Sequence, residues 1–560
     1  MADYAFGANI IENLTTGMYQ DSKVIYREYI QNACDQIDKA EKLGILQPRN
    51  PHSRFPDLGE GVINIWLKPE ERCIVIEDNA TGIKAEDFQR TLGSIADSDK
   101  VMGEDKGFRG IGRLCGLAYC KRLVFTSRWA GEDIISIMSC DALKMRKMIN
   151  EANTKVQKHS AIDVLNAMIE FSTRSANKKD PEHFFRVELI DINDENEELF
   201  GGNDDDNLKQ LTNYLSFVAP VPYDANFIYR SDIYNHASKL NVRIDEYNIK
   251  INGAQIFKKY KTHLKTGNGS DDVFGVEFYD FLADDDSLIG WMWFGKTTFK
   301  AAIKEEEISR GLRLRKENIQ IGEDDTLRDL FTREASKRGY NYFIGEIFAV
   351  SRELIPNSQR AYFNENPARI DFERRLKEYF NDTLYYIYHE GSDINSSIKK
   401  INSYHEKVSE FEMKEAQGRF LTTEEREREE LELKVKEQEA EKAMKYLEKK
   451  SNNSSKSSIL TPQIIERRAK EIGTIDICKK TDKSSAEPSK GSDDRSSAES
   501  EPLTNKSKKK FLVDTMFPRA SRSERKLLSE TLEKIFVIIQ KSADKKTSEN
   551  LINKIKEELK

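Results

Sequence analysis

Residues 25–38 read IYREYIQNACDQID. Glu28, Asn32 and Asp35 stand at positions i, i+4 and i+7, and these offsets share one face of an α-helix. Apolar residues recur beside them at helical spacing, so the stretch predicts an amphipathic helix with an acid, an amide and a second acid on one face. Taken alone, this face also fits an ordinary solvated helix surface, and two later segments bear on the choice.

The first of these segments is CIVIEDNATGI at residues 73–83. Its apolar residues predict a buried strand that ends at Asp78, and Gly82 predicts a tight turn directly afterwards. A carboxylate at such a strand end can accept a hydrogen bond from an exocyclic amine deep in a pocket. The alternative is an ordinary Asp between a strand and a loop.

The second segment is GFRGIGRLCGLA at residues 107–118. Gly107, Gly110 and Gly112 precede an apolar helical pattern, and glycines there let backbone N–H groups approach phosphate oxygens. A dinucleotide-binding fingerprint would need a strand immediately before the glycines, but the preceding residues are polar. A Walker P-loop is excluded because no G-K-[ST] follows.

In this order and spacing the three segments resemble the Bergerat-fold ATPases, the superfamily of gyrase, Hsp90, histidine kinases and MutL. The resemblance is strongest to the Hsp90 branch, whose helix reads RELISNAxDA where this chain has REYIQNACDQ. TLGSIADS at residues 91–98 is similar to the LGxIAxS pattern at the start of the Hsp90 lid. The resemblance extends over about residues 8–130 and implies an α/β sandwich that binds ATP.

The resemblance implies a role for each polar residue. Glu28 would be the general base that orients the attacking water, and Asn32 would hold Mg²⁺ through its side-chain oxygen. Asp35 would line the pocket, and Asp78 would accept from the adenine amino group. Mg²⁺ prefers few protein ligands together with phosphates and waters, so one Asn would be sufficient.

The resemblance also implies a glycine-rich site around the nucleotide. Gly82 and Ile83 would give room to the base, and residues 93–112 would form a mobile lid. The expected contacts to the phosphates are Gly107, Arg109, Gly110, Ile111 and Gly112.

Two positions depart from the family pattern. The family turn is D-x-G-x-G, and Ala80 replaces its first glycine. Family members often have a Thr on a late strand that supports the base-binding Asp, whereas this chain has His183 and Phe184 near that place. Thr173 lies on an earlier stretch and is an open substitute.

A weaker match lies in the second half of the chain. LIPNSQRAYF at residues 354–363 is similar to the loop LPLNxSRE of the Hsp90 middle domain. The resemblance implies that Arg360 reaches the γ-phosphate, and a solvated Arg in a surface turn is the alternative. Arg313, Arg315 and Lys316 are further candidates, although we favour an exposed strand face for them.

The patterns predict an α+β protein with several parts. We expect an Hsp90-like ATP-binding domain at 1–205, a middle or transducer-like α/β domain at 206–388, a charged helical region at 389–450, a mostly disordered linker at 451–510 and a C-terminal helical unit at 511–560. Strands are expected at 62–67, 73–77, 123–126, 134–138 and 185–190, then at 242–251, 273–279, 288–294, 312–321 and 342–350. Helices are expected at 21–43, 325–337, 367–388, 459–473, 523–541 and 548–559.

The charged region contains few apolar residues, and Thr422 with Glu425 predicts a capping box that starts a second helix there. A solvated helical hairpin and a self-associating coiled coil both fit this pattern.

Composition excludes some classes of function. The chain has 560 residues, 33% of them charged, and its formal net charge of -7 argues against a globally basic nucleic-acid binder. The six cysteines form no C-x-x-C pair, so a zinc site is not expected. Without a signal-peptide pattern or an apolar run of about 18 residues, we expect a cytoplasmic protein with no membrane span.

The sequence therefore predicts a magnesium-dependent ATPase that changes conformation, closes its lid and dimerises to remodel or clamp an unknown protein client. A DNA-associated clamp of the MutL or MORC type is one alternative, supported by basic runs at 506–510 and 519–526. A scaffold that binds nucleotide without hydrolysing it is another. A histidine kinase is not expected, because no dimerisation helix with a phospho-accepting His precedes the ATPase segments.

Overall fold

The computed structural model describes residues 6–15, 17, 21–49, 57–95, 112–200, 205–267, 269–451 and 460–472. All of them belong to one compact unit, Met1–Lys479. Most of the predicted linker, the C-terminal unit with its two expected helices, and both basic runs lie outside the described residues. So do Gly107, Arg109, Gly110 and Ile111. The described part mixes helices with several sheets, which confirms the α+β class.

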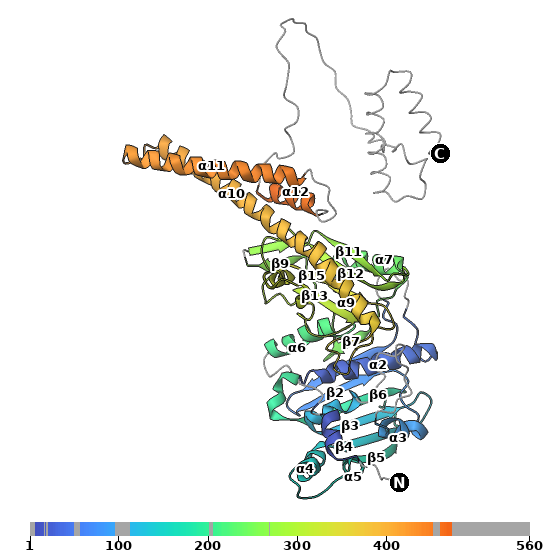
Figure 1. The fold of residues 1–560 in the computed structure, drawn as a ribbon. Coiled ribbons are helices and arrows are strands. Elements are labelled where there is room, and N and C mark those ends of the chain that lie inside the picture. The colour runs from blue at the N-terminus through green and yellow to red at the C-terminus, as the bar shows by residue number, and fades with distance from the viewer. Residues whose placement is uncertain are drawn as a thin grey trace, which may run out of the picture. The chain divides into compact units, whose positions relative to one another are not determined.

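An eight-stranded sheet organises the N-terminal half (Figure 1). Its strand order is β5-β4-β3-β6-β2-β1-β7-β8, and every neighbouring pair is antiparallel except β1 with β7. The strands are β1 (Val62–Lys68), β2 (Cys73–Asp78), β3 (Cys120–Arg128), β4 (Ile134–Asp141), β5 (Ile169–Ser175), β6 (Phe184–Ile192), β7 (Asn248–Ile251) and β8 (Ala254–Gln255).

Helices and the sheet enclose one apolar core. On β1, Ile63, Ile65 and Leu67 are buried while Asn64 and Trp66 are partly exposed, the alternation of a sheet with helices on one face. The helical segments of this half are α1 (Asn9–Leu14), α2 (Val24–Lys42), α3 (Ala85–Gly93), η1 (Gly112–Ala118), α4 (Ala142–Asn153), α5 (Ala161–Met168), η2 (Asp194–Leu199) and α6 (Asp205–Val218).

Most strands of this sheet match their prediction. The expected strands at 62–67, 73–77, 123–126, 134–138 and 185–190 are confirmed as β1, β2, β3, β4 and β6, whereas β5 was not expected. The strand expected at 242–251 forms only from Asn248, and it pairs with β1 of the first sheet. Asn252 ties this addition down, because its N–H donates to the carbonyl oxygen of Ile65 (2.8 Å) and its Oδ1 accepts from the N–H of Leu67 (2.9 Å). The sheet thus continues past position 206, and the division into domains stays a prediction.

A second, five-stranded sheet has the order β11-β12-β15-β13-β14, and a separate pair joins β9 to β10. Both faces of its central strands are buried, because one core packs against α9 and α10 while another packs aromatic residues with α7 on the opposite face. The strands are β9 (His263–Thr266), β10 (Gly269–Asp272), β11 (Gly275–Leu282), β12 (Leu288–Lys296), β13 (Gly311–Lys316), β14 (Ile319–Gln320) and β15 (Ile344–Ala349). The short helical segments are α7 (Arg230–Lys239), η3 (Arg328–Leu330), α8 (Glu334–Lys337) and η4 (Arg338–Tyr342).

Two expectations for this region are wrong. The single strand expected at 312–321 is a hairpin, because Glu317 and Asn318 adopt φ of 53° and 60° and form a two-residue turn between β13 and β14. The long helix expected at 325–337 is replaced by η3 and α8. Thr332 interrupts it by donating both its N–H and its hydroxyl to Asn381 Oδ1, at 3.1 and 3.0 Å.

A helical arm follows the second sheet (Figure 1). It consists of α9 (Pro367–Tyr379), the π-helical η5 (Phe380–Leu384), α10 (Tyr385–Ala416), α11 (Thr423–Ser451) and α12 (Thr461–Ile472), so the expected helices at 367–388 and 459–473 are present. Thr422 Oγ1 accepts from the N–H of Glu425 (3.1 Å), which confirms the predicted cap. The hairpin of α10 and α11 is also present, while self-association stays a prediction. None of the described helices combines the length and apolar composition that crossing a membrane requires.

Candidate nucleotide site

Helix α2 carries the three predicted polar residues on its surface. Its apolar side is buried in the core, where Ile25, Ile30 and other residues pack against the sheet. Glu28 and Asn32 remain half-buried, whereas Asp35 is only 7% exposed. The helix therefore holds a carboxylate and an amide at the edge of the core and places a second carboxylate inside it.

Asp78 ends β2 as a buried carboxyl group. Its Oδ1 accepts a hydrogen bond from the N–H of Ala80 at 3.0 Å. Burial raises the pKa of Asp78 to about 8, while the Ala80 N–H opposes that shift and the nearby Glu77 carboxylate adds to it. A carboxyl group that is this poorly solvated gains from a polar ligand that can replace the missing water.

The turn after Asp78 is clamped to β3, which β6 separates from β2 in the sheet. Gly82 has φ of 68°, and a Cβ there would lie 2.0 Å from the carbonyl oxygen of Arg128, so only glycine fits. Ser127 Oγ accepts from the N–H of Ile83 at 2.8 Å, and His183 Nδ1 lies 2.7 Å from the carbonyl oxygen of Ala80. Ala80 is fully buried, so the methyl group that replaces the family glycine is accommodated.

Strand register places the hydroxyl of Ser127 level with Asp78 in the sheet. Asp78 pairs with Phe185 on β6, and Phe185 pairs with Ser127 on β3, so the three residues share one row across the sheet. Thr173 is exposed on β5, which β4, β3 and β6 separate from β2. Thr173 therefore does not support Asp78. Ser127 was not identified from the sequence, because only strand register brings it here.

Gly112 places the end of the glycine-rich segment against α2. It is the first residue of η1, and a Cβ on it would lie 2.0 Å from Glu28 Oε2. The carboxylate of Glu28 thus contacts the Gly112 backbone. Of the predicted phosphate contacts, Gly112 is the one that the described residues include, and it lies beside the predicted general base.

Arg360 also lies close to α2. Its loop closes through a β-bridge between Pro356 and Phe363, and Arg27 of α2 donates to the carbonyl oxygen of Gln359 at 2.8 Å. Arg360 is only 5% exposed and has φ of 53°, an uncommon conformation for a residue other than glycine.

Burial lowers the pKa of Arg360, and the carboxylate of Glu28 is the largest opposing influence. Asp35 also favours the charged guanidinium. The structure therefore brings Arg360, which is distant in sequence, into the electrostatic field of the predicted base and pocket wall.

The other basic candidates, Arg313, Arg315 and Lys316, form hydrogen bonds and ion pairs around the second sheet. The exposed strand face expected for them is wrong, because every residue of β13 is buried. Arg313 donates to Gln320 Oε1 at 3.1 Å, Arg315 pairs with Glu346, and Lys316 Nζ donates to the carbonyl oxygen of Ser351 at 2.7 Å. These side chains are occupied within their own sheet, which leaves Arg360 as the better-placed candidate.

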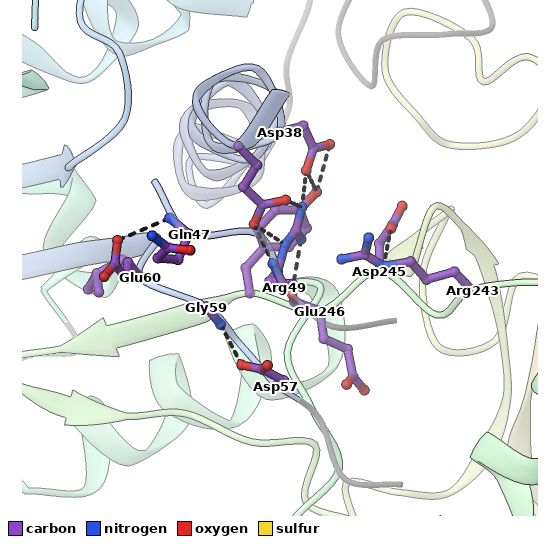
Figure 2. Close-up of polar contacts among 12 residues, drawn as sticks. Asp38, Gln47, Arg49, Asp57, Gly59, Glu60, Arg243, Asp245 and Glu246 are labelled. Atoms are coloured by element: carbon purple, nitrogen blue, oxygen red, sulfur yellow. Dashed lines mark hydrogen bonds and ion pairs between the residues drawn. The ribbon is translucent and has the colours of Figure 1, made fainter. Parts of the chain in front are cut away.

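Arg49 anchors the far end of α2 to the second half of the chain, as Figure 2 shows. It pairs with Asp38 and with Glu41 (2.6 Å), and it donates to the carbonyl oxygen of Glu246 at 3.1 Å. Its guanidinium also lies 4.0 Å from the ring centre of Tyr247, whose hydroxyl donates to Asp38. The sequence carried no recognisable signal for this junction.

Comparison with known proteins places the N-terminal part in a family. Residues 22–175 match the family model described as histidine kinase-, DNA gyrase B-, and HSP90-like ATPase. The chaperone protein HtpG of Sulfurovum sp. is 26% identical over 156 residues, which are 25% of this chain and 24% of that relative.

Other relatives give a similar result. HtpG of Helicobacter hepaticus is 29% identical over 136 residues, covering 22% of this chain and 21% of the relative. HtpG of Acinetobacter baylyi is 28% identical over 144 residues, covering 23% and 22%. The alignments thus span less than a quarter of the length of these relatives. Helix α2, Asp78 and Gly112 lie within the segment that the family model matches. Residues 22–175 are thus similar to the histidine kinase-, DNA gyrase B- and HSP90-like ATPases.

Proposed function

We propose that this chain is an ATP-binding and ATP-hydrolysing conformational switch of the Hsp90-like type. The observation that carries the proposal is the environment of Glu28, which contacts the backbone of Gly112 and lies in the field of Arg360. An acid on α2 and the end of a glycine-rich segment therefore meet, and the acid favours the charged form of a buried arginine. Hydrolysis of a phosphoanhydride needs such a positioned base together with donors for the developing charge.

The base of the nucleotide would bind at the end of β2. Asp78 would accept from the adenine amino group, and its buried position makes this hydrogen bond strong. Gly82 and Ile83 would lie beside the ring, held in place by the contact of Ile83 with Ser127. Asp35 would form the wall of the pocket from α2.

The phosphates would lie along the more exposed part of α2. Asn32 stands one helical turn after Glu28, and a single amide oxygen beside phosphates and waters is a donor set that suits Mg²⁺. The bound metal would neutralise charge on the phosphate oxygens. Gly107, Arg109, Gly110 and Ile111 would contact the phosphates together with Gly112, and Glu28 would orient the water.

The output would be a change of conformation. Residues 93–112 would close over the nucleotide, Arg360 would complete the site, and two copies of the chain would associate. We propose that this cycle remodels or clamps a protein client in the cytoplasm. The second half of the chain supports this proposal by supplying Arg360.

Steady-state ATP hydrolysis and nucleotide binding test the proposal with three variants. Glu28→Ala should lower kcat about 100-fold or more and retain ATP binding, because it removes the base without touching the pocket. Asn32→Ala and Asp78→Ala should instead weaken ATP binding. Size measurements with a non-hydrolysable ATP analogue should detect a dimer.

The same measurements separate the alternatives. Hydrolysis that is absent in the wild type favours the non-hydrolysing scaffold, and hydrolysis that survives in Glu28→Ala contradicts the assigned roles. Salt-sensitive DNA binding that is lost on removal of residues 505–560 would instead support a DNA-associated clamp.

A further inference from the structure

Tyr29 follows Glu28 on α2 and reaches the segment that begins at Gly112. It is 3% exposed, and its hydroxyl donates to the carbonyl oxygen of Arg113 at 3.0 Å. The same hydroxyl accepts from the N–H of Gly116 at 3.1 Å. A tyrosine hydroxyl can donate one hydrogen bond and accept others. Tyr29 donates to Arg113 and accepts from Gly116, so its hydroxyl holds both turns of η1.

Gly116 is adapted to this contact. A Cβ at Gly116 would lie 2.6 Å from the Tyr29 hydroxyl, closer than any ordinary contact. The first turn of η1 is also held from another side, since the guanidinium of Arg113 donates to the carbonyl oxygen of Ser94, directly after α3. The Tyr29 hydroxyl is thus the link from η1 to the helix that carries the predicted base.

The contact between Gly112 and Glu28 lies directly beside the hydrogen bonds of Tyr29. Gly112 precedes Arg113, and the Gly112 backbone lies against the carboxylate of Glu28. A shift of η1 by a few tenths of an ångström would alter this contact. The motif RELISNAxDA has Leu where this chain has Tyr29, so the hydroxyl is a feature of this sequence.

We infer that Tyr29 is a positioning residue for hydrolysis, which fixes Gly112 against Glu28 and so sets the orientation of the Glu28 carboxylate. Tyr29 touches neither the water nor the phosphates in this assignment and acts through η1. The inference rests on the proposed ATPase function, since it concerns the geometry of the same base.

Tyr29→Phe tests this inference in the full-length chain. The variant keeps the ring and its packing and removes both hydrogen bonds to η1. We expect kcat to fall about tenfold, because misplacement of a catalytic group reduces the rate, while the KM for ATP and ADP binding change less than about twofold. Gly116→Ala disturbs the same contact from the other side and should reproduce the split between kcat and KM.

Tyr26→Phe is the matched control. Tyr26 is also buried on α2, but its hydroxyl donates to the carbonyl oxygen of Leu199 in η2 and does not contact η1. Tyr26→Phe should lower the melting temperature about as much as Tyr29→Phe does, and it should leave kcat unchanged. A Tyr29→Phe protein with wild-type kcat overturns the inference, as does an equal loss of kcat in both variants.

Glu28→Ala distinguishes the positioning role of Tyr29 from the proposed ATPase function. If that variant abolishes hydrolysis while Tyr29→Phe does not slow it, the ATPase proposal stands and the role of Tyr29 is wrong. If Glu28→Ala hydrolyses ATP normally, the role assigned to Glu28 is wrong and the positioning role of Tyr29 with it. If the wild-type protein does not hydrolyse ATP, the proposed function itself is overturned.

Discussion

Gly82 and Gly112 differ in what an added methyl group would do. At Gly82 the obstacle is the rigid carbonyl of Arg128, and the positive φ adds strain, so alanine would displace the turn that holds Ile83. At Gly112 the obstacle is the end of the flexible Glu28 side chain, so alanine would move the carboxylate and leave the backbone in place. The substitution at Gly82 would thus affect the predicted base pocket, and the substitution at Gly112 would affect the predicted general base.

Asp78 should make the stability of the nucleotide-free protein depend on pH. Burial raises the pKa of Asp78 to about 8, whereas an unfolded Asp titrates near ~3.9. The folded state therefore binds the proton more tightly, and stability falls as the pH rises from about 4 through 8. Asp78→Asn, which is neutral at every pH, should gain stability relative to the wild type as the pH rises, and should bind ATP more weakly.

Denaturant unfolding at pH 6 and pH 8.5 checks this expectation, with Glu70→Gln as an exposed control that should not alter the trend. An Asp78→Asn protein whose stability follows the wild type at both pH values would contradict the raised pKa.

Helix α2 combines three tasks because its faces have different neighbours. One face packs in the core, one carries Glu28 and Asn32, and its C-terminal half is tied through Asp38 and Glu41 to Arg49. The helix that would bind the nucleotide is therefore fixed to the segment around Glu246. A displacement of α2 would therefore also move the segment around Glu246.

Arg49→Met should destabilise the protein strongly. The variant leaves the carboxylates of Asp38 and Glu41 without their buried guanidinium, and removal of one partner of a buried ion pair costs about 3–5 kcal/mol. Chemical denaturation measures the loss. Arg90→Met removes an exposed i,i+3 pair with Asp87 and should cost less than about 1 kcal/mol. Equal losses in the two variants would show that the Arg49 junction contributes little.

At the scale of the whole molecule, residues far apart in the chain contribute to one site. Arg27 and Gln359 are separated by 332 positions, and their hydrogen bond holds the loop of Arg360 against α2. The first sheet likewise incorporates β7 and β8 from beyond the predicted domain boundary. A nucleotide bound at α2 would thus adjoin a loop from the second half of the chain.

Arg360→Ala should slow hydrolysis far more than it weakens ATP binding. An arginine that stabilises the transferring phosphoryl group is worth about 10³-fold or more in kcat, and Arg360 is a buried arginine whose charged form Glu28 favours. Single-turnover experiments measure the rate of hydrolysis, and nucleotide titration measures the affinity for ATP. Arg352→Ala, an exposed arginine of the same region, is the control. Unchanged turnover in Arg360→Ala would remove this residue from the site.

The sequence by itself determined where the candidate residues lie, because helices and strands depend on spacing within a short segment. The shared helix face of Glu28, Asn32 and Asp35 follows from helical periodicity, and the position of Asp78 follows from a strand that ends before a turn, whereas their predicted roles follow from the family resemblance. The α+β class and most strands were predictable for the same reason. The hairpin at Glu317 and Asn318 was missed because its two-residue turn interrupts an alternation of apolar and polar residues that is typical of one strand.

Only the tertiary structure decided which partners these residues meet. Ser127 reaches Ile83 through strand register, Tyr29 reaches η1 through packing of α2, and Arg27 reaches Gln359 through the folding of the distant loop that carries Arg360. Such contacts join positions from 44 to 332 apart in the chain, and their formation depends on the summed packing of both sheets. Local periodicity contains no information on that packing, so the sequence identified the candidate residues and could not predict which partners they meet.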